Sequence, residues 1–176
     1  MNFLQKTIAG IAVAVTAAAA PVEASTYYND HVRLVQAVEQ VGVDFQLNPF
    51  ECFQFQNRNI YGWYYGAGQT LVVCQQNAKN SQEVAWTEED FDTLRHEAHH
   101  LVQDCMDGLL QGRLESVYQE PVVLAKDVLG YDMIMRILRG YSDLDEHRQL
   151  MELEAFAVAR MSDPDEQIED IQRYCM

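Results

Sequence analysis

The sequence predicts an α+β domain, because helical and strand-like patterns occur in separate blocks along the chain. Residues 28–41 place valines at helical spacing. Residues 43–76 are rich in aromatic and β-branched residues around Gly66-Ala67-Gly68, which predicts a β-hairpin. After residue 87 the pattern is helical again. We therefore expect an N-terminal helix, a short antiparallel sheet and a C-terminal helical part.

The helices are marked by start and stop signals. Thr87 is the expected N-cap of a helix over residues 87–106, with acidic residues in its first turn and Gly108 after its end. Asp145 stands in capping-box position after Ser142. Further helices are expected at 121–130, 131–140, 143–161 and from Pro164 onward. In the first helix, His31 is expected to lie at the surface rather than to bind a ligand.

The aromatic residues before the hairpin turn allow two interpretations. They can pack across strands in the ordinary way, which we favour, or form a rim that grips a ligand. The residues concerned are Tyr61, Trp63, Tyr64 and Tyr65.

Length and charge restrict the possible partners. The chain has 176 residues, which suits one domain with a packed core. It carries 12 Lys and Arg against 27 Asp and Glu, a net charge of −15. A chain without a basic stripe is not expected to bind nucleic acid or an anionic membrane surface.

Residues 1–24 have the pattern of a secretory signal peptide. Lys6 gives a positive start, residues 8–20 form an apolar run, and Val22-Glu23-Ala24 fits a cleavage site. We therefore expect residues 25–176 to form a single exported domain, secreted or periplasmic, with no membrane attachment after the leader is removed. No oligomeric state is predicted.

All four cysteines lie in the expected mature part. An even number of cysteines in an exported chain predicts two disulfides, with three possible connectivities. We favour Cys52–Cys74, within the β region, and Cys105–Cys175, between a helix and the C-terminus.

Residues 96–100 read His-Glu-Ala-His-His, an HExxH motif inside the helix expected at 87–106. Side chains four residues apart share one helical face, so His96 and His100 can bind one metal ion. Glu97 then lies beside the metal, where it can take a proton from metal-activated water. His99 would be one of the variable positions of the motif and not a metal ligand.

A catalytic zinc site needs a third protein ligand, which leaves a fourth position for water. Glu154 falls in the middle of the apolar arc of the helix at 143–161, where a lone carboxylate is costly unless it is paired or metal-bound. We therefore expect Glu154 to be the third ligand. Pairing with a buried Arg or Lys is the alternative for Glu154, and Glu152 is the next candidate for the ligand.

With these residues the chain resembles the zincin metallopeptidases, and within them the gluzincins, whose third ligand is a glutamate. The segment from Thr93 to Val102 fits the extended zincin pattern, and Glu154-Ala155 is similar to the Glu-Ala of the third-ligand helix. The resemblance implies zinc held by His96, His100 and Glu154.

The same resemblance implies a zincin-like fold and peptide-bond hydrolysis with Glu97 as general base, on a peptide or protein substrate. It also implies that a strand near residues 69–74 forms the edge of the cleft where an extended substrate pairs. The chain departs from the pattern at Val158, where many gluzincins carry an acidic residue that supports a ligand histidine. Support would then come from elsewhere, for example Asp104.

The transition-state oxyanion needs a hydrogen-bond donor. Three side chains are candidates: His147, Tyr141 and Tyr131. His147 is slightly favoured, because it falls on the same helical face as Glu154.

Three other functions were weighed against a peptidase. A di-iron carboxylate bundle is rejected, because it needs a second ExxH element and the chain has none. A non-catalytic exported binding or structural protein on a zincin-like scaffold is the main alternative. An acidic inhibitor-like protein that binds a basic partner without metal is the third.

Overall fold

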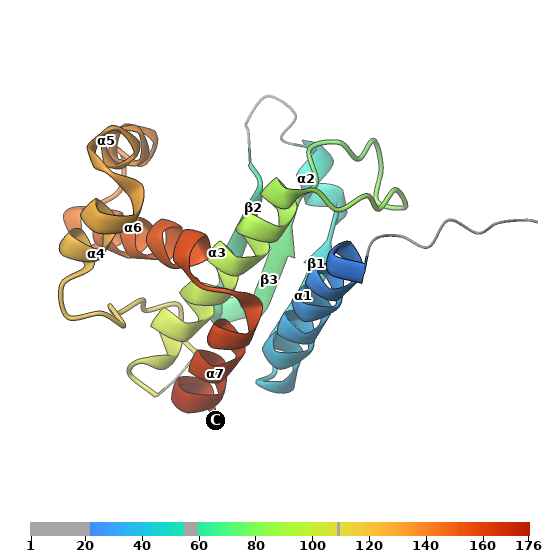
Figure 1. The fold of residues 1–176 in the computed structure, drawn as a ribbon, viewed down its shortest axis with the longest axis horizontal. Helices are drawn as coiled ribbons and strands as arrows, with labels where there is room; N and C mark the ends of the chain where they lie inside the picture. Colours follow the sequence, from blue (N-terminus) through green and yellow to red (C-terminus); the bar gives the residue numbers. More distant parts are fainter. Residues whose placement is uncertain (1–21, 55–59, 109) are drawn as a thin grey trace, which may run out of the picture.

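A long helix in the middle of the molecule, α3 (Glu88–Cys105), organises the fold. The computed structural model describes residues 22–54, 60–108 and 110–176. Helix α3 lies between the sheet with α1 on one side and the helices α4 to α6 on the other (Figure 1). The remaining elements are α1 (Val22–Gln40), β1 (Asp44–Leu47), α2 (Phe50–Gln54), β2 (Gly62–Tyr65), the short 3₁₀ turn η1 (Gly66–Gly68), β3 (Thr70–Val73), α4 (Pro121–Leu129), α5 (Tyr131–Gly140), α6 (Glu146–Met161) and α7 (Pro164–Cys175).

Helix α3 begins as its capping signal predicts. The Thr87 hydroxyl accepts a hydrogen bond from the backbone N–H of Asp90 at 3.3 Å. The Asp90 carboxylate in turn accepts from the Thr87 N–H at 2.8 Å. This reciprocal capping box satisfies two backbone donors that the first turn would otherwise leave free, which holds the start of α3 in place.

The sheet is mixed rather than wholly antiparallel. Its strand order is β1-β3-β2, with β2 antiparallel to β3 and β1 parallel to β3. The predicted hairpin is therefore present as β2 and β3, but the expectation of an antiparallel sheet misses β1. The strand predicted as the cleft edge, near residues 69–74, is the central strand. Because β3 is paired on both sides, the open edge next to α3 belongs to β2.

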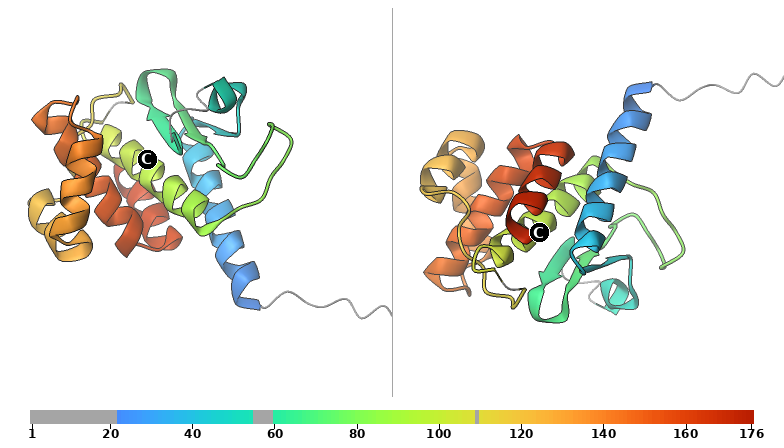
Figure 2. Two further views of the ribbon diagram at one scale, coloured as in Figure 1. Left: turned by 90° about the horizontal axis from the view of Figure 1, so that it is seen from above. Right: turned by 90° about the horizontal axis from the view of Figure 1, so that it is seen from below.

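The buried apolar residues form two cores. The first lies among α1, the sheet, α3 and α7, and the second lies among α4, α5 and α6. Helix α7 packs against both α1 and α3, whereas α4 and α5 lie on the far side of α6 from the sheet (Figure 2). Helices α3 and α6 therefore face each other where the two cores meet.

Both predicted cysteine pairings are present. Cys52–Cys74 joins α2 to the residue after β3, and Cys105–Cys175 joins the last residues of α3 and α7. The described residues contain no free cysteine. The first disulfide therefore ties α2 to the end of the central strand, and the second ties the C-terminal helix to α3.

Two element boundaries differ from expectation. Helix α1 begins at Val22, ahead of the predicted residue 28, and helix α6 is capped by Asp145 itself, whose carboxylate accepts from the N–H of Arg148 at 2.8 Å. Of the expected leader, residues 1–21 lie outside the described part, and residues 22–24 form the first turn of α1. Among the residues that the structure describes, no helix combines the length and the apolar character needed to cross a membrane.

The expectation that His31 is a surface residue is wrong. Its ring is 2% exposed, with Nδ1 2.8 Å from the carbonyl oxygen of Tyr27 and Nε2 2.7 Å from a guanidinium nitrogen of Arg95. A carbonyl oxygen only accepts and a guanidinium only donates, so Nδ1 carries the proton and Nε2 accepts from Arg95. The ring is therefore held neutral, on the side of α3 away from the HExxH histidines.

We expect His31 to make the protein less stable in acid. Burial lowers the pKa of this imidazole below its ordinary value of 6.5, and the adjacent Arg95 acts in the same direction. The hydrogen bond to the Tyr27 carbonyl and the charges of Glu88 and Asp30 oppose them without cancelling them. The unfolded chain therefore binds a proton that the folded chain excludes, and stability present above about pH 6.5 is lost as the pH falls below it. Urea unfolding of the parent and of His31→Gln at pH 7.5 and pH 5.5 measures this. The parent should lose more free energy of unfolding than the variant, and equal losses would contradict the assignment.

Candidate metal centre

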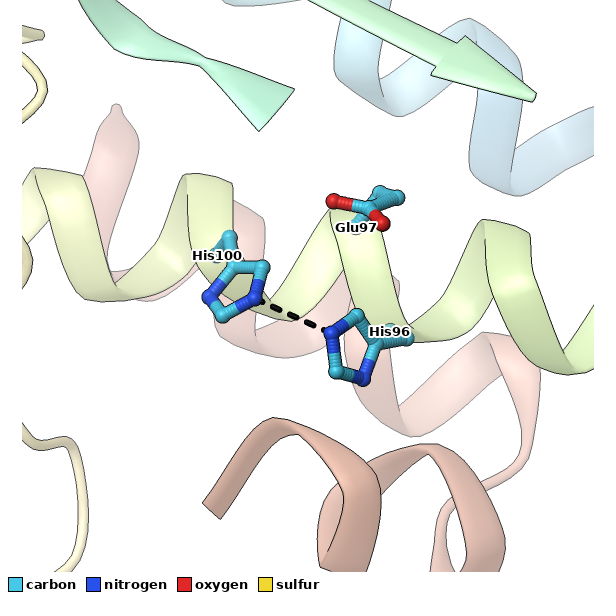
Figure 3. A group of neighbouring side chains, drawn as sticks. All are labelled: His96, Glu97 and His100. Carbon is cyan, nitrogen blue, oxygen red and sulfur yellow. Dashed lines mark hydrogen bonds between the residues drawn. The ribbon is translucent and has the colours of Figure 1, made fainter. Parts of the chain in front are cut away.

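Two histidines of the HExxH motif turn their ring nitrogens toward each other. The Nε2 atoms of His96 and His100 are 3.1 Å apart, and the two rings meet edge to face with centroids 4.7 Å apart. Figure 3 shows both rings on one side of α3 with Glu97 beside them. Both imidazoles are buried, at 7% and 5% exposure. The i, i+4 spacing thus gives the convergence that the sequence predicts.

A carboxylate from α6 completes the convergence. One oxygen of Glu152 lies 3.3 Å from Nε2 of His96, and its other oxygen lies 3.5 Å from Nε2 of His100. The Oε2 atom is buried and accepts no hydrogen bond from any residue that the structure describes. Two ring nitrogens and one carboxylate oxygen therefore gather at one point between α3 and α6.

The charges of this group are strongly coupled. Burial by itself would raise the pKa of Glu152, but the two histidines outweigh it and hold that pKa well below its ordinary range. Burial likewise opposes protonation of His100, yet the contact with Glu152 raises its pKa to about 9. Glu152 and His100 therefore form a buried ion pair.

Glu97 lies next to the two histidines and against the sheet. Its ligand atom and those of His96 and His100 all lie within 4.8 Å of one another. Burial raises the pKa of the Glu97 carboxyl, and Glu152 adds to this, while the two histidines and the backbone N–H of Tyr64 lower it. A buried carboxyl with a raised pKa is a suitable proton acceptor near neutral pH.

A glycine allows β2 to approach Glu97. A Cβ built on Gly62 would lie 2.5 Å from the carbonyl oxygen of Val72 and 2.8 Å from Cγ2 of Thr93. Real Cβ atoms do not make such contacts, so any larger residue would push the edge strand away from α3. Gly62 therefore fixes the spacing between the open edge of the sheet and the Glu97 side chain.

The convergent group lies in the middle of a two-lobed cleft. The lobes have volumes of about 990 and 1080 Å³, and His96 and Glu97 line both. Strand β2 contributes Gly62 and Trp63 to both lobes, and Tyr141 also lines both. The first lobe continues past apolar side chains of α4 to α6: Leu129, Met133 and Phe156. The second lobe continues along the loop at residues 111–115 to His147 and Arg148.

Of the three candidate oxyanion donors, Tyr141 lies closest to the centre of the cleft. Burial, and then the carboxylates of Glu152 and Glu97, raise the pKa of its phenol, so the hydroxyl stays protonated. His147 is exposed on the wall of the second lobe, with Nε2 2.8 Å from the carbonyl oxygen of Leu114. Tyr131 is 72% exposed and lines neither lobe.

Comparison with known proteins assigns a family. A family model described as a domain of unknown function, DUF8637, matches residues 2–176. The chain belongs to the DUF8637 family. No curated protein and no solved structure matches it.

In this DUF8637 chain, Glu154 does not reach the two convergent histidines. Its carboxylate is fully buried on another face of α6 than Glu152, where it accepts hydrogen bonds from Nε2 of His99 at 2.9 Å and from the amide of Gln103 at 3.0 Å. It also accepts from the Ser116 hydroxyl and from the N–H of Val117 at 3.0 Å. The carboxylate that faces the histidines is Glu152. A buried Glu154 was correctly predicted, but it is satisfied by hydrogen bonds of the protein.

Two further expectations for the DUF8637 chain change. Asp104 does not support a ligand histidine, because it accepts from the Tyr64 hydroxyl at 2.8 Å and from the N–H groups of Gly112 and Arg113 at 2.8 and 2.9 Å. The residue that does contact a ligand histidine is Gln103, whose Oε1 lies 2.7 Å from Nδ1 of His100. Sequence reasoning missed this role, although the i, i+3 spacing of the two residues was a signal for it.

The aromatic cluster of the DUF8637 chain combines both of its interpretations. Tyr64 packs against the first core, whereas Tyr61 and Trp63 line the first lobe of the cleft. Tyr65, at 58% exposure, lies at the rim of the second lobe. Alternation along the strand explains this division, since successive side chains point to opposite faces.

Proposed function

We propose that the chain is an exported zinc-dependent metallopeptidase, with His96, His100 and Glu152 as ligands and Glu97 as general base. The observation that carries the proposal is the convergence of two Nε2 atoms and a carboxylate beside Glu97, in the middle of a cleft open on both sides. The HExxH motif and the resemblance to zincins support zinc-dependent peptide hydrolysis as the reaction.

The donor set fits zinc. Two imidazole nitrogens and one carboxylate oxygen are the protein ligands of many catalytic zinc sites. The buried Oε2 of Glu152, which makes no hydrogen bond with a described residue, would coordinate the ion. Zinc in such a set supplies a Lewis acid that polarises a carbonyl group and makes a water more acidic.

Glu97 would move the proton. Its carboxylate faces the space next to the two histidines, within reach of a water attacking a substrate carbonyl. It would accept the proton of that water and deliver it to the leaving amine nitrogen, so that the peptide bond breaks without a free charge on nitrogen. The hydrogen bond from the Tyr64 N–H holds the carboxylate in this position.

Tyr141 would stabilise the negative charge that develops on the carbonyl oxygen. Its hydroxyl lies within hydrogen-bond range of Glu152 and stays protonated. A preorganised hydrogen-bond donor of this kind is typical of oxyanion stabilisation. His147, which already bonds to Leu114, would line the substrate path instead.

The cleft suits an extended chain. It passes on both sides of the catalytic group, and the edge of β2 that pairs with no described strand runs along it. A peptide laid along that edge could add as a further strand, which presents one carbonyl group after another to the centre. We therefore propose a peptide or protein as the substrate.

Export is part of the proposal. It rests on the leader-like sequence of residues 1–24 and on two disulfides, which persist in oxidising compartments.

Metal analysis and peptide hydrolysis test the function together. The purified protein should contain or take up about one zinc ion per chain, the number that one three-ligand site would hold, and should hydrolyse casein or a fluorogenic peptide library. A chelator should abolish hydrolysis and added zinc should restore it. A protein that binds no zinc and cleaves nothing would leave the chain a binding or structural protein and refute the proposal.

A further inference from the structure

A buried glutamine connects the metal centre to α6. Gln103 is fully buried, and its Oε1 lies 2.7 Å from Nδ1 of His100. Its amide nitrogen lies 3.1 Å from the carbonyl oxygen of Met151 and 3.0 Å from a carboxylate oxygen of Glu154. The side chain therefore contacts a proposed ligand at one end and two oxygen atoms of α6 at the other.

The two oxygen atoms of α6 decide which way the amide is turned. A carbonyl oxygen accepts hydrogen bonds only, and so does an ionised carboxylate. The NH₂ group of Gln103 must therefore face Met151 and Glu154, because an amide oxygen placed there would meet two acceptors. The amide oxygen is left to face His100, and it can only accept. Nδ1 of His100 must then carry a proton.

Glu154 is itself held in place. Its carboxylate accepts from Nε2 of His99 at 2.9 Å and from the N–H groups of Val117 and Tyr118 at 3.0 and 3.3 Å, in addition to the Ser116 hydroxyl. A carboxylate with this many donors cannot rotate to release Gln103 without breaking several of these bonds. The orientation of Gln103 is thus fixed by groups outside the cleft.

His96 has no such partner. Its Nδ1 is buried and makes no hydrogen bond with any described residue. The two histidines of the motif are therefore not equivalent, since among the described residues only His100 has a hydrogen-bond partner at Nδ1.

We propose that Gln103 is a positioning residue, which, held by Glu154, keeps His100 protonated at Nδ1 and aims its Nε2 at the metal. The proposal rests on the proposed function for the identity of the ion. In this proposal Glu154 does not bind the metal; it hydrogen-bonds to Gln103, which in turn hydrogen-bonds to the ligand His100.

The first test compares two buried glutamines. Gln103→Met removes the amide next to His100, and Gln167→Met removes a second buried amide, whose nitrogen bonds to the carbonyl oxygen of Arg95 at 3.0 Å. Zinc affinity is measured by competition with a chromophoric chelator. Gln103→Met should bind zinc about 10- to 100-fold more weakly than the parent, as expected when the partner of a ligand histidine is lost. Gln167→Met should bind it like the parent. Equal affinity of all three proteins would overturn the proposal.

The second test needs no metal. Long-range ¹H–¹⁵N spectra of the imidazoles of the metal-free protein should show His100 with a proton on Nδ1 that exchanges slowly with water. Gln103→Met should lose this protection. If Gln103→Met does not fold, Gln103→Asn replaces it: its side chain is one methylene shorter, so its amide oxygen should no longer reach Nδ1 of His100 and the protection of the Nδ1 proton should fall. An Nδ1 without a proton in the parent overturns the proposal, whereas a parent that shows the signal but binds no zinc refutes only the proposed function.

Discussion

Glu97→Gln is expected to lower the rate of peptide hydrolysis by about 10²- to 10⁴-fold, the contribution of a positioned general base. The amide has nearly the volume of the carboxylate and can still contact the Tyr64 N–H, but it cannot accept the proton of an attacking water. The two histidines and Glu152 are unchanged, so the variant should still bind about one zinc ion per chain. Steady-state hydrolysis of a peptide substrate and metal analysis of the same preparation measure both effects.

Glu169→Gln provides a matched control for this prediction. Glu169 is exposed on α7, away from both lobes of the cleft, and the substitution makes the same change of charge. The control should cleave like the parent. A Glu97→Gln protein that holds zinc and cleaves at the parental rate would refute the general-base role and leave the rest of the metal site intact.

Glu152→Gln should mainly weaken zinc binding, whereas Glu154→Gln should mainly lower the stability of the metal-free protein. Glu152→Gln removes a proposed ligand, so its zinc affinity should fall by more than the roughly 100-fold that marks the upper range for supporting residues. Glu154→Gln removes the charge that holds His99 and the 116–118 loop, so the metal-free protein should lose about 1–3 kcal/mol of stability, as for a buried hydrogen-bonding group left unsatisfied. Zinc competition and urea unfolding, applied to both variants, measure the two effects.

The two carboxylates lie two residues apart on one helix, so each variant is a control for the other. If Glu154→Gln weakened zinc binding more than Glu152→Gln did, the third ligand would be Glu154, in a rearranged site. If neither weakened it, the third ligand would lie outside α6.

Local signals predicted the elements around the site better than they predicted their pairing. The capping box of Thr87 and Asp90 and the HExxH spacing are readable because they depend on residues within one helix. Strand β1 was missed because a four-residue strand with a parallel partner depends on its contact with β3, more than twenty residues later.

The choice between Glu152 and Glu154 shows the same limit. A helical wheel assigns one face of α6 to the core, and it placed Glu154 there correctly. Helix α6, however, packs against α4 and α5 on one side and against α3 on another, so several of its faces are buried. Which carboxylate meets His96 and His100 is decided by how α3 and α6 are set against each other, and a single helix carries no signal for that.

The placement of the disulfides has a consequence for how the molecule opens. Helices α4, α5 and α6 contain no cysteine and lie in the loop between Cys105 and Cys175, whose disulfide joins the ends of α3 and α7. We expect partial unfolding to begin inside this loop and to carry Glu152 and Tyr141 away while His96 and His100 keep their places on α3. An ion bound by residues of both α3 and α6 would stabilise the contact between these helices. Loss of the metal would then favour detachment of α4 to α6, and their detachment would release the metal.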